Sequence, residues 1–157
     1  MNVTSRSRYG LKIMMDLAHF SQGRLVKRLD IASRQGVPSS YLDQILIKLR
    51  KAGLVSSVRG RDGGYELSEK AVNISVWDIM SAVEGSVYPV ICCADEGMSC
   101  GLEDTCITSG PWQRIFVDIR NQLKSISLAG LCEDFCGGLN IQKVGGVREC
   151  YHRRTNS

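Results

Sequence analysis

The stretch from Val26 to Leu67 constrains the fold of this chain most, because it reads as helix, tight turn, helix and hairpin in unbroken succession. Gly36 can form the turn, and Pro38 can start the second helix, where its missing N–H costs nothing. Within residues 39–50 the apolar residues recur at i, i+3, i+4 and i+7, namely Leu42, Ile45, Leu46 and Leu49. This spacing predicts a helix with one buried face.

A basic hairpin is predicted directly after this helix. Residues 54–58 (LVSSV) alternate as a short strand, and Gly63 and Gly64 permit a turn before residues 65–67 return. Helix, turn, helix and hairpin in this order predict a mainly α-helical fold built on a winged helix-turn-helix with a small β-hairpin wing.

The polar face of the helix at 39–50 and the hairpin tip carry the groups that a DNA reader needs. A recognition helix places its first residues on base edges and its cations on phosphates, and an arginine on the hairpin can enter an A·T-rich minor groove. The candidate DNA-binding residues are Ser39, Ser40, Tyr41, Asp43, Gln44, Lys48, Lys51, Arg59 and Arg61. Taken alone, each element also fits a merely solvated surface.

Charge is divided unevenly along the 157 residues, whose net charge is +4. Residues 1–67 contain 12 Lys and Arg against 5 Asp and Glu, whereas residues 68–157 contain 8 against 11. A basic first half fits a module that binds a polyanion, joined to a part that does not. The N-terminus has no apolar core of a signal sequence, and no apolar run reaches the ~18 residues of a membrane span, so we expect a cytoplasmic protein without membrane contact.

We expect the whole chain to divide into three parts. These are a DNA-binding domain at 1–70, a cysteine-bearing loop with dimerisation helices at 71–135, and a flexible tail at 136–157. We expect helices at 5–20, 27–35 and 75–84, with Asp16 on the polar face of the first and Leu29 in the core.

A long helix is predicted from Gly110, with Pro111 in its first turn. Its apolar seam comprises Trp112, Ile115, Phe116, Ile119, Leu123 and Ile126. A seam this long needs a partner surface, either in the core or on a second copy. We expect a homodimer, because DNA readers of this type commonly pair across two half-sites.

Seven cysteines in a reducing compartment argue against a disulfide framework and favour metal or redox chemistry. Four of them lie on the aperiodic stretch between residues 86 and 109: Cys92, Cys93, Cys100 and Cys106. No C-x2-C pair of structural zinc or of thioredoxin-like enzymes is present there. The wide spacing suits an iron-sulfur cluster, with only one of the two adjacent cysteines as a ligand. Nearby carboxylates should raise the pKa of these thiols, so that metal binding must drive their deprotonation.

Several motifs resemble the Rrf-type family of bacterial winged-helix regulators, namely SSYL, LRKAGLV, VRG-x-x-GGY and the cysteine loop followed by TSGPW. The resemblance runs from residue 1 to about residue 135, and the family includes the iron-sulfur cluster regulator, the nitric-oxide-sensing repressor and the rhizobial iron regulator. It implies a homodimer that binds an operator in double-stranded DNA. It also implies a cluster held by Cys92, Cys100 and Cys106, with Cys93 as a substitute or fourth ligand.

This chain departs from two members of the family at their fourth ligand. Ser109 stands where the cluster regulator has histidine, and Arg8 stands where the nitric-oxide sensor has aspartate. The fourth ligand is therefore open between Cys93, a group of the partner subunit, and solvent or a small molecule. The resemblance leans towards the rhizobial iron regulator and favours [4Fe-4S] over [2Fe-2S].

Together these features predict a transcriptional regulator, not an enzyme, whose operator binding is gated by an iron-sulfur cluster that senses iron, redox state or nitric oxide. One alternative is a cluster-free family member gated by a protein partner or by thiol oxidation. A second is an iron-sulfur electron-transfer or carrier protein. The remaining cysteines, Cys132, Cys136 and Cys150, fall outside the family motif and are expected to be partly buried or tail thiols.

Overall fold

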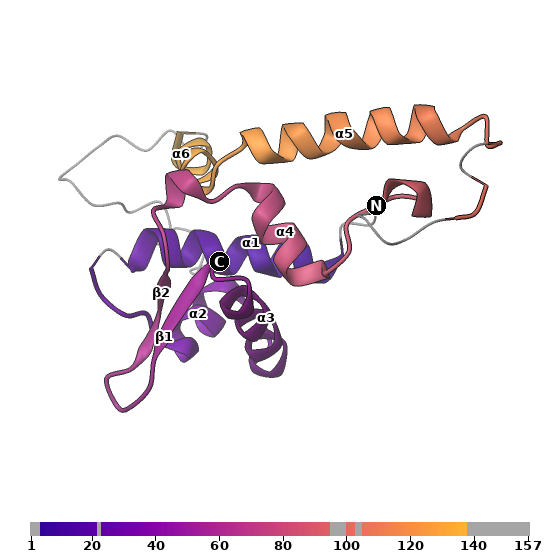
Figure 1. The fold of residues 1–157 in the computed structure, drawn as a ribbon. Helices are drawn as coiled ribbons and strands as arrows, with labels where there is room; N and C mark the ends of the chain where they lie inside the picture. Colours follow the sequence, from indigo (N-terminus) through magenta and orange to yellow (C-terminus); the bar gives the residue numbers. More distant parts are fainter. Residues whose placement is uncertain (1–3, 22, 95–99, 103–104, 138–157) are drawn as a thin grey trace.

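The structure is a computed structural model that describes residues 4–21, 23–94, 100–102 and 105–137 (Figure 1). The regular elements are α1 (Ser5–Phe20), α2 (Arg28–Gln35), α3 (Ser39–Lys51), β1 (Val55–Val58), β2 (Gly64–Leu67), α4 (Val76–Glu84), α5 (Ser109–Ser125) and α6 (Leu128–Gly137). This mainly helical winged helix-turn-helix confirms the predicted fold class. Residues 138–157, in the expected tail, lie outside the described residues.

Helix α1 lies at the centre of the fold and packs against α2, α3, α4 and α6. Thr4 caps it by accepting a hydrogen bond from the backbone N–H of Arg6. Its inner face is fully buried and consists of Ile13, Met14 and Leu17. The buried stripe of α3 meets this face, and the spacing of its leucines and isoleucines therefore predicts the core correctly.

Two expectations about the first two helices are wrong. Asp16 is fully buried, because α2 packs over this side of α1 and its carboxylate pairs with the guanidinium of Arg34 at 2.7 and 2.9 Å and with Nε2 of Gln35 at 2.8 Å. Leu29, expected in the core, is 65% exposed. It lies two residues before the buried Ile31, which turns it about 200° around the helix to the outer side.

The wing is a two-stranded antiparallel sheet, in which Val58 pairs with Gly64 beside the turn. A third segment joins it at one point, since Val26 and Tyr65 exchange two backbone hydrogen bonds of 2.9 Å. The chain before α2 is therefore tied directly to the base of the wing.

Gly63 and Gly64 have a purpose beyond the predicted turn. The left-handed residue of the turn is Gly60, with φ of 117°. A Cβ atom on Gly63 would lie 2.2 Å from the carbonyl oxygen of Val58, and one on Gly64 would lie 2.7 Å from that of Val26. These two glycines are needed because backbones approach closely, as well as for the turn.

Helix α4 begins at a capping box in which the side chains and backbones of Ser75 and Asp78 bond reciprocally. It ends at Gly85, where the cysteine loop begins and runs through a short 3-10 turn at Ile91–Cys93. Helix α5 then starts at Ser109, and Pro111 lies in its first turn as predicted. Beyond α5 the chain returns to the base of α4, where Leu128 donates to the carbonyl of Ile74 at 2.8 Å.

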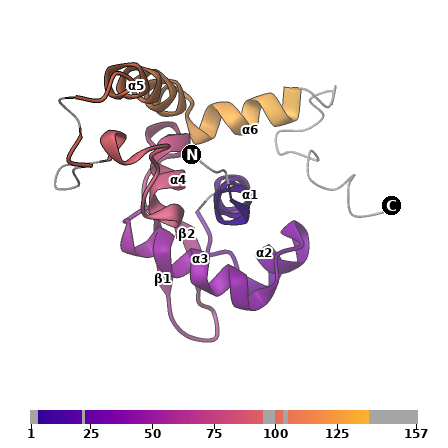
Figure 2. The ribbon, with the colours of Figure 1, turned by 90° about the vertical axis from the view of Figure 1, so that its right-hand side faces the viewer.

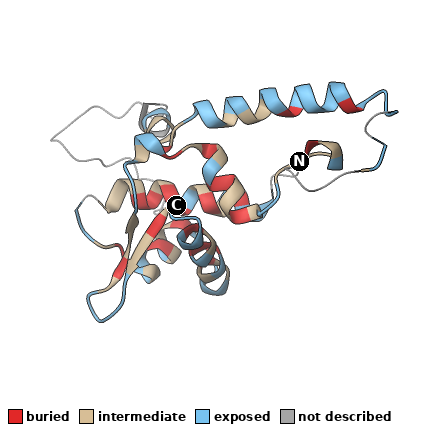
Figure 3. Ribbon diagram, in the orientation of Figure 1, coloured by how far each residue is buried: buried red, intermediate tan, exposed pale blue. Residues whose placement is uncertain are grey.

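Helix α5 lies on the opposite side of the molecule from α3 and the wing (Figures 1 and 2). Most of its residues are exposed (Figure 3). The residues buried along it are Ser109 and Phe116, and the ring of Phe116 meets Trp77 of α4 edge to face at 5.9 Å. No described helix is both long enough and apolar enough to cross a membrane.

Candidate DNA-binding surface and cysteine loop

The outer face of α3 lies directly opposite its buried stripe. With 100° per residue, four side chains fall at the middle of this face, and all are exposed: Ser40, Gln44, Ile47 and Lys51. Ser39 is exposed at the first turn. The helix therefore presents hydroxyl and amide groups near its N-terminus and a cation near its C-terminus. Ile47 is not among the residues predicted from the sequence to contact DNA, although the same angular count places it on this face.

Two candidate residues of α3 are directed toward the protein. The ring of Tyr41 packs edge to face against Tyr9 of α1, with centroids 5.4 Å apart. Lys48 donates from Nζ to the carbonyl oxygen of Val83, the penultimate residue of α4, at 2.5 Å. Both side chains are partly buried, and both hold α3 against its neighbours.

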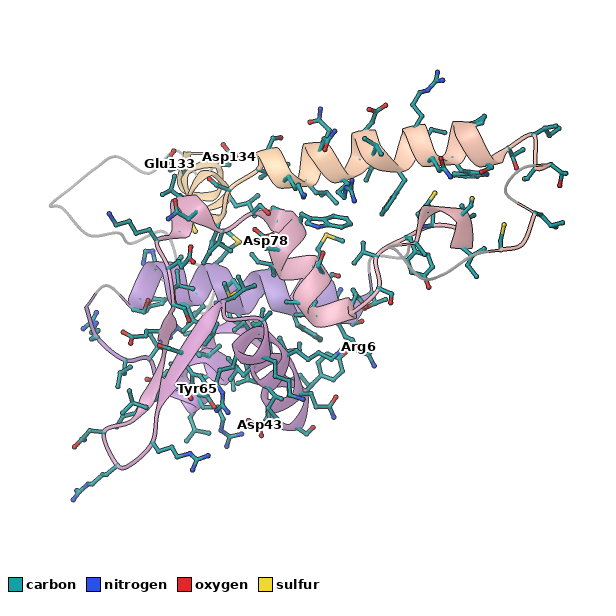
Figure 4. All side chains as sticks on the ribbon, in the orientation of Figure 1. Arg6, Asp43, Tyr65, Asp78, Glu133 and Asp134 are labelled. Atoms are coloured by element: carbon teal, nitrogen blue, oxygen red, sulfur yellow. The ribbon has the colours of Figure 1, made fainter. Side chains whose placement is uncertain are left out.

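Asp43 is paired within the helix-turn-helix. Both of its carboxylate oxygens accept from Nη1 of Arg28 on α2, at 3.0 and 3.1 Å. Figure 4 labels Asp43 on α3, at the edge of the molecule away from α5. The pair is half exposed, so it contributes little to stability, but it offsets the one carboxylate of the recognition helix.

The wing tip brings two more cations to the same side of the molecule as α3. Arg59 and Arg61 are both exposed on the turn between β1 and β2. Nη1 of Arg50 at the end of α3 donates to Oγ of Ser57 on β1 at 3.1 Å, which links the helix to the wing. The geometry thus places a row of polar and basic groups on one face, as base reading with phosphate contacts requires.

The end of α4 connects α3 to the start of the cysteine loop. Beside Val83, Glu84 accepts through Oε1 from Oγ1 of Thr4 at 2.5 Å and from Oγ and N–H of Ser7 at 2.6 and 3.2 Å. Burial alone would raise the pKa of Glu84, but the hydrogen bonds from Ser7 and Thr4 and the charge of Arg6 outweigh it and lower the pKa. No local sequence pattern indicates this junction, because its contacts join residues far apart in the chain.

Two of the loop cysteines, Cys92 and Cys106, lie near the first turns of α5. Nε2 of Gln113 donates to the carbonyl oxygen of Cys92 at 3.2 Å, and Cys106 stands three residues before the helix. Cys92 and Cys100 are partly buried, and Cys106 is exposed. Among the described residues, no three side chains of His, Cys, Asp or Glu come together in a group that could hold a metal ion. The expected ligands therefore share one loop but are not gathered in this structure.

Two thiols of this loop, those of Cys93 and Cys106, have opposite pKa shifts. Burial and the neighbouring Cys92 raise the pKa of Cys93, as expected in direction but not in cause. For Cys106 the expectation is wrong, because hydrogen bonds from the hydroxyl and N–H of Thr108, and from the N–H of Ser109, lower its pKa. The start of α5 favours the thiolate there. The carboxylates expected to raise the thiol pKa values, at 95, 96, 103 and 104, lie outside the described residues.

Of the remaining cysteines, the structure describes the side chain of Cys132. Cys132 on α6 is partly buried against the core, and burial followed by the charge of Glu133 raises its pKa. Nothing is described for the side chain of Cys136 or for Cys150, which fall outside the described side chains.

Comparison with known proteins agrees with the fold. A model of the Rrf2 family, described as iron-dependent transcriptional regulators, matches residues 3–134. The HTH-type transcriptional regulator IscR of Xenorhabdus nematophila is 43% identical over 99% of this chain and 91% of its own length, and that of Photorhabdus laumondii is 40% identical over 98% and 90%.

Solved structures give the same result. IscR of T. potens superposes with a TM-score of 0.71 at 32% identity, covering 91% of this chain and 94% of that one. CymR, the global cysteine regulator of B. subtilis, superposes with a TM-score of 0.67 at 31% identity, covering 85% and 97%. The chain therefore belongs to the Rrf2 family, a family of transcriptional regulators and not of enzymes.

Proposed function

We propose that this regulator binds operator DNA through α3 and the wing, and that an iron-sulfur cluster held by the loop between α4 and α5 gates this binding. The observation that carries the proposal is the junction at the end of α4. The loop leaves α4 at Gly85, directly after the two residues that bind Lys48 of the recognition helix and the first turn of α1. Ordering of the loop can therefore act on α3 through contacts that already exist.

The donor set of the loop fits an iron-sulfur cluster. Thiolates are the usual ligands of such clusters, and Cys92, Cys100 and Cys106 would supply three. Cys106 is held at the start of α5 where its thiolate is favoured, whereas Cys93 is 8% exposed with a raised pKa. These properties support Cys92 over Cys93 as the first ligand. The fourth ligand is not assigned, and the resemblance favours [4Fe-4S].

When bound, the cluster would supply the centre that responds to the signal, because iron shortage limits its assembly and oxygen and nitric oxide react with it. The loop cysteines would hold the cluster. Gln113 holds the backbone of the loop at Cys92 against α5, and the end of α4 holds α3 and α1. The description of the family as iron-dependent regulators supports this proposal.

We also propose that the protein acts as a homodimer through α5. The side chains of Trp112 and Ile115, on one face of α5, are 41% and 48% exposed on a helix that lies away from the core. Burying them against a second copy would stabilise the pair and set the separation of the two recognition helices. The three-part division at 1–70, 71–135 and 136–157 is retained as part of this proposal.

The test is to purify the protein without oxygen and to measure iron, sulfide and visible absorption together with binding to its operator. Cys100→Ser and Cys106→Ser should lose iron and sulfide and change operator affinity, because each removes a proposed ligand. Cys132→Ser on α6 is the matched control and should change neither.

Two results would contradict the proposal in distinguishable ways. A colourless protein without iron or sulfide that still binds the operator would indicate a cluster-free regulator, gated by a protein partner or thiol oxidation. A protein that carries a cluster but shows no salt-dependent duplex binding would indicate an electron carrier, since phosphate contacts make affinity fall steeply with salt.

A further inference from the structure

An isoleucine lies at the middle of the exposed face of α3. Ile47 is 52% exposed, with Gln44 one turn before it and Lys51 one turn after it on the same face. Single exposed apolar residues are common on protein surfaces, so exposure alone says little. The position is what matters, because Ile47 lies directly opposite the buried stripe, where a solvated helix carries polar side chains. Isoleucine is also a weaker helix former than Lys or Glu, so helix stability does not explain it.

The charge around Ile47 selects the kind of partner that would cover it. Arg50 and Lys51 are exposed beyond it on α3, and the wing carries two further exposed arginines. The carboxylate of α3, Asp43, is paired with Arg28. The basic residues around Ile47 would attract a polyanion, so the group that contacts the Ile47 side chain would be an apolar group of that polyanion. In the major groove of DNA that group is the methyl of thymine, the one apolar group on the base edges.

We infer that Ile47 is a specificity-determining residue that contacts the 5-methyl group of a thymine at the middle of each half-site. The inference rests on the proposed binding of α3 in the major groove. Helix α3 rises about 4.5 Å from Gln44 to Ile47, close to the ~3.4 Å between base pairs. The two side chains thus face neighbouring base pairs. Because the amide of Gln44 suits adenine, the expected half-site has adjacent A·T pairs at its centre.

The experiment uses the full-length protein, purified without oxygen, and an operator enriched by this protein from a random duplex library. Each thymine of the operator is then replaced singly by deoxyuracil, which lacks only the methyl group. At one position in each half-site, deoxyuracil should weaken binding of the wild-type protein by about three- to fivefold, the size expected for one methyl group.

The variant Ile47→Ala should lose that discrimination at the same position and retain the response to deoxyuracil elsewhere. Ile47 is exposed and alanine favours helix, so the variant should melt like the wild type. Val72→Ala is the matched control, because Val72 is a β-branched residue 62% exposed in the turn at Ala71–Asn73, which packs against α6. It should discriminate thymine from deoxyuracil like the wild type.

The outcomes separate this inference from the proposed function. Equal binding of thymine and deoxyuracil operators at every position, or unchanged discrimination in Ile47→Ala, would overturn the role of Ile47 while operator binding stands. Failure to enrich any duplex would overturn operator binding itself, and the role of Ile47 with it.

Discussion

At the scale of single residues, two side chains hold the end of α4 in place. Lys48 donates to the last turn of α4, and Glu84 accepts from the first turn of α1. A carboxylate at the start of a helix also interacts favourably with the helix dipole. These contacts make the end of α4 a fixed point shared by α1, α3 and the cysteine loop.

The charge of Glu84 should therefore contribute to stability in a pH-dependent way. Hydrogen bonds hold its pKa below the ordinary value of 4.5, so its contribution is present above the unfolded pKa and is lost as pH falls through the folded pKa. We expect Glu84→Gln to lower the free energy of unfolding at neutral pH, and the difference from wild type to shrink in acid. Urea unfolding at both pH values measures this.

The same change at an exposed carboxyl, Glu69→Gln, is the control for Glu84. It should leave the free energy of unfolding nearly unchanged at neutral pH. A difference for Glu84→Gln that is as large in acid as at neutral pH would show that the packing of this side chain matters, and not its charge.

At the scale of elements, the wing depends on close backbone contact at its turn. A Cβ atom on Gly63 would meet the carbonyl oxygen of Val58 at 2.2 Å, a distance that no side-chain movement relieves. The position of Arg59 and Arg61 depends on this turn, because both lie between the two paired strands.

We expect Gly63→Ala to shift the wing and weaken operator binding by about tenfold or more, since a contact of this kind can change affinity by about 1–3 kcal/mol. Binding titrations on the enriched operator measure it. Gly110→Ala is the control, because it lies in the first turn of α5 with open space around its Cβ position. Wild-type affinity in Gly63→Ala would mean that the wing does not contact DNA.

At the scale of the whole molecule, two surfaces with different chemistry lie on opposite sides. Helix α3 and the wing present polar and basic groups, whereas α5 exposes Trp112 and Ile115 of its apolar seam. Figure 1 shows that α5 and α3 lie on opposite sides, and Figure 3 shows that most of α5 is exposed. Such a seam is typical of a surface that a second protein copy covers. The cysteine loop joins the two sides through α4 and the start of α5.

The dimer proposed through α5 should be sensitive to charge on this seam. We expect light scattering to give about twice the 17.3 kDa of one chain for the wild type. For Ile115→Lys we expect the mass of a single chain, because an unpaired charge in an apolar interface is costly. Asn121 lies nine residues after Trp112, about 180° around the helix, so Asn121→Lys puts the same charge on the face opposite the seam and should stay dimeric. A dimeric Ile115→Lys would place the interface elsewhere.

Much of the fold could be predicted from local patterns. The stripe of α3, the seam of α5 and the turn at Gly36 follow from spacing and backbone preference, and the helix boundaries agree to within a few residues. The predictions that failed concern single side chains. Asp16 is predicted on a polar face, but α2 covers it and Arg34 pairs with it. Cys106 is predicted to have a raised pKa in an acidic loop, but hydrogen bonds at the start of α5 lower its pKa.

The sequence by itself determined the elements of this protein and their order, because periodicity and turn residues act over a few neighbours. It also provides candidates for DNA contact and for metal binding, and these stay predictions. Only the tertiary structure decided which of the candidate side chains on α3 are turned inward, as Tyr41 and Lys48 are, and which face solvent, as Gln44 does. The reason is physical: the partner of a side chain on a helix is set by the elements that pack against it, and these come from distant parts of the chain.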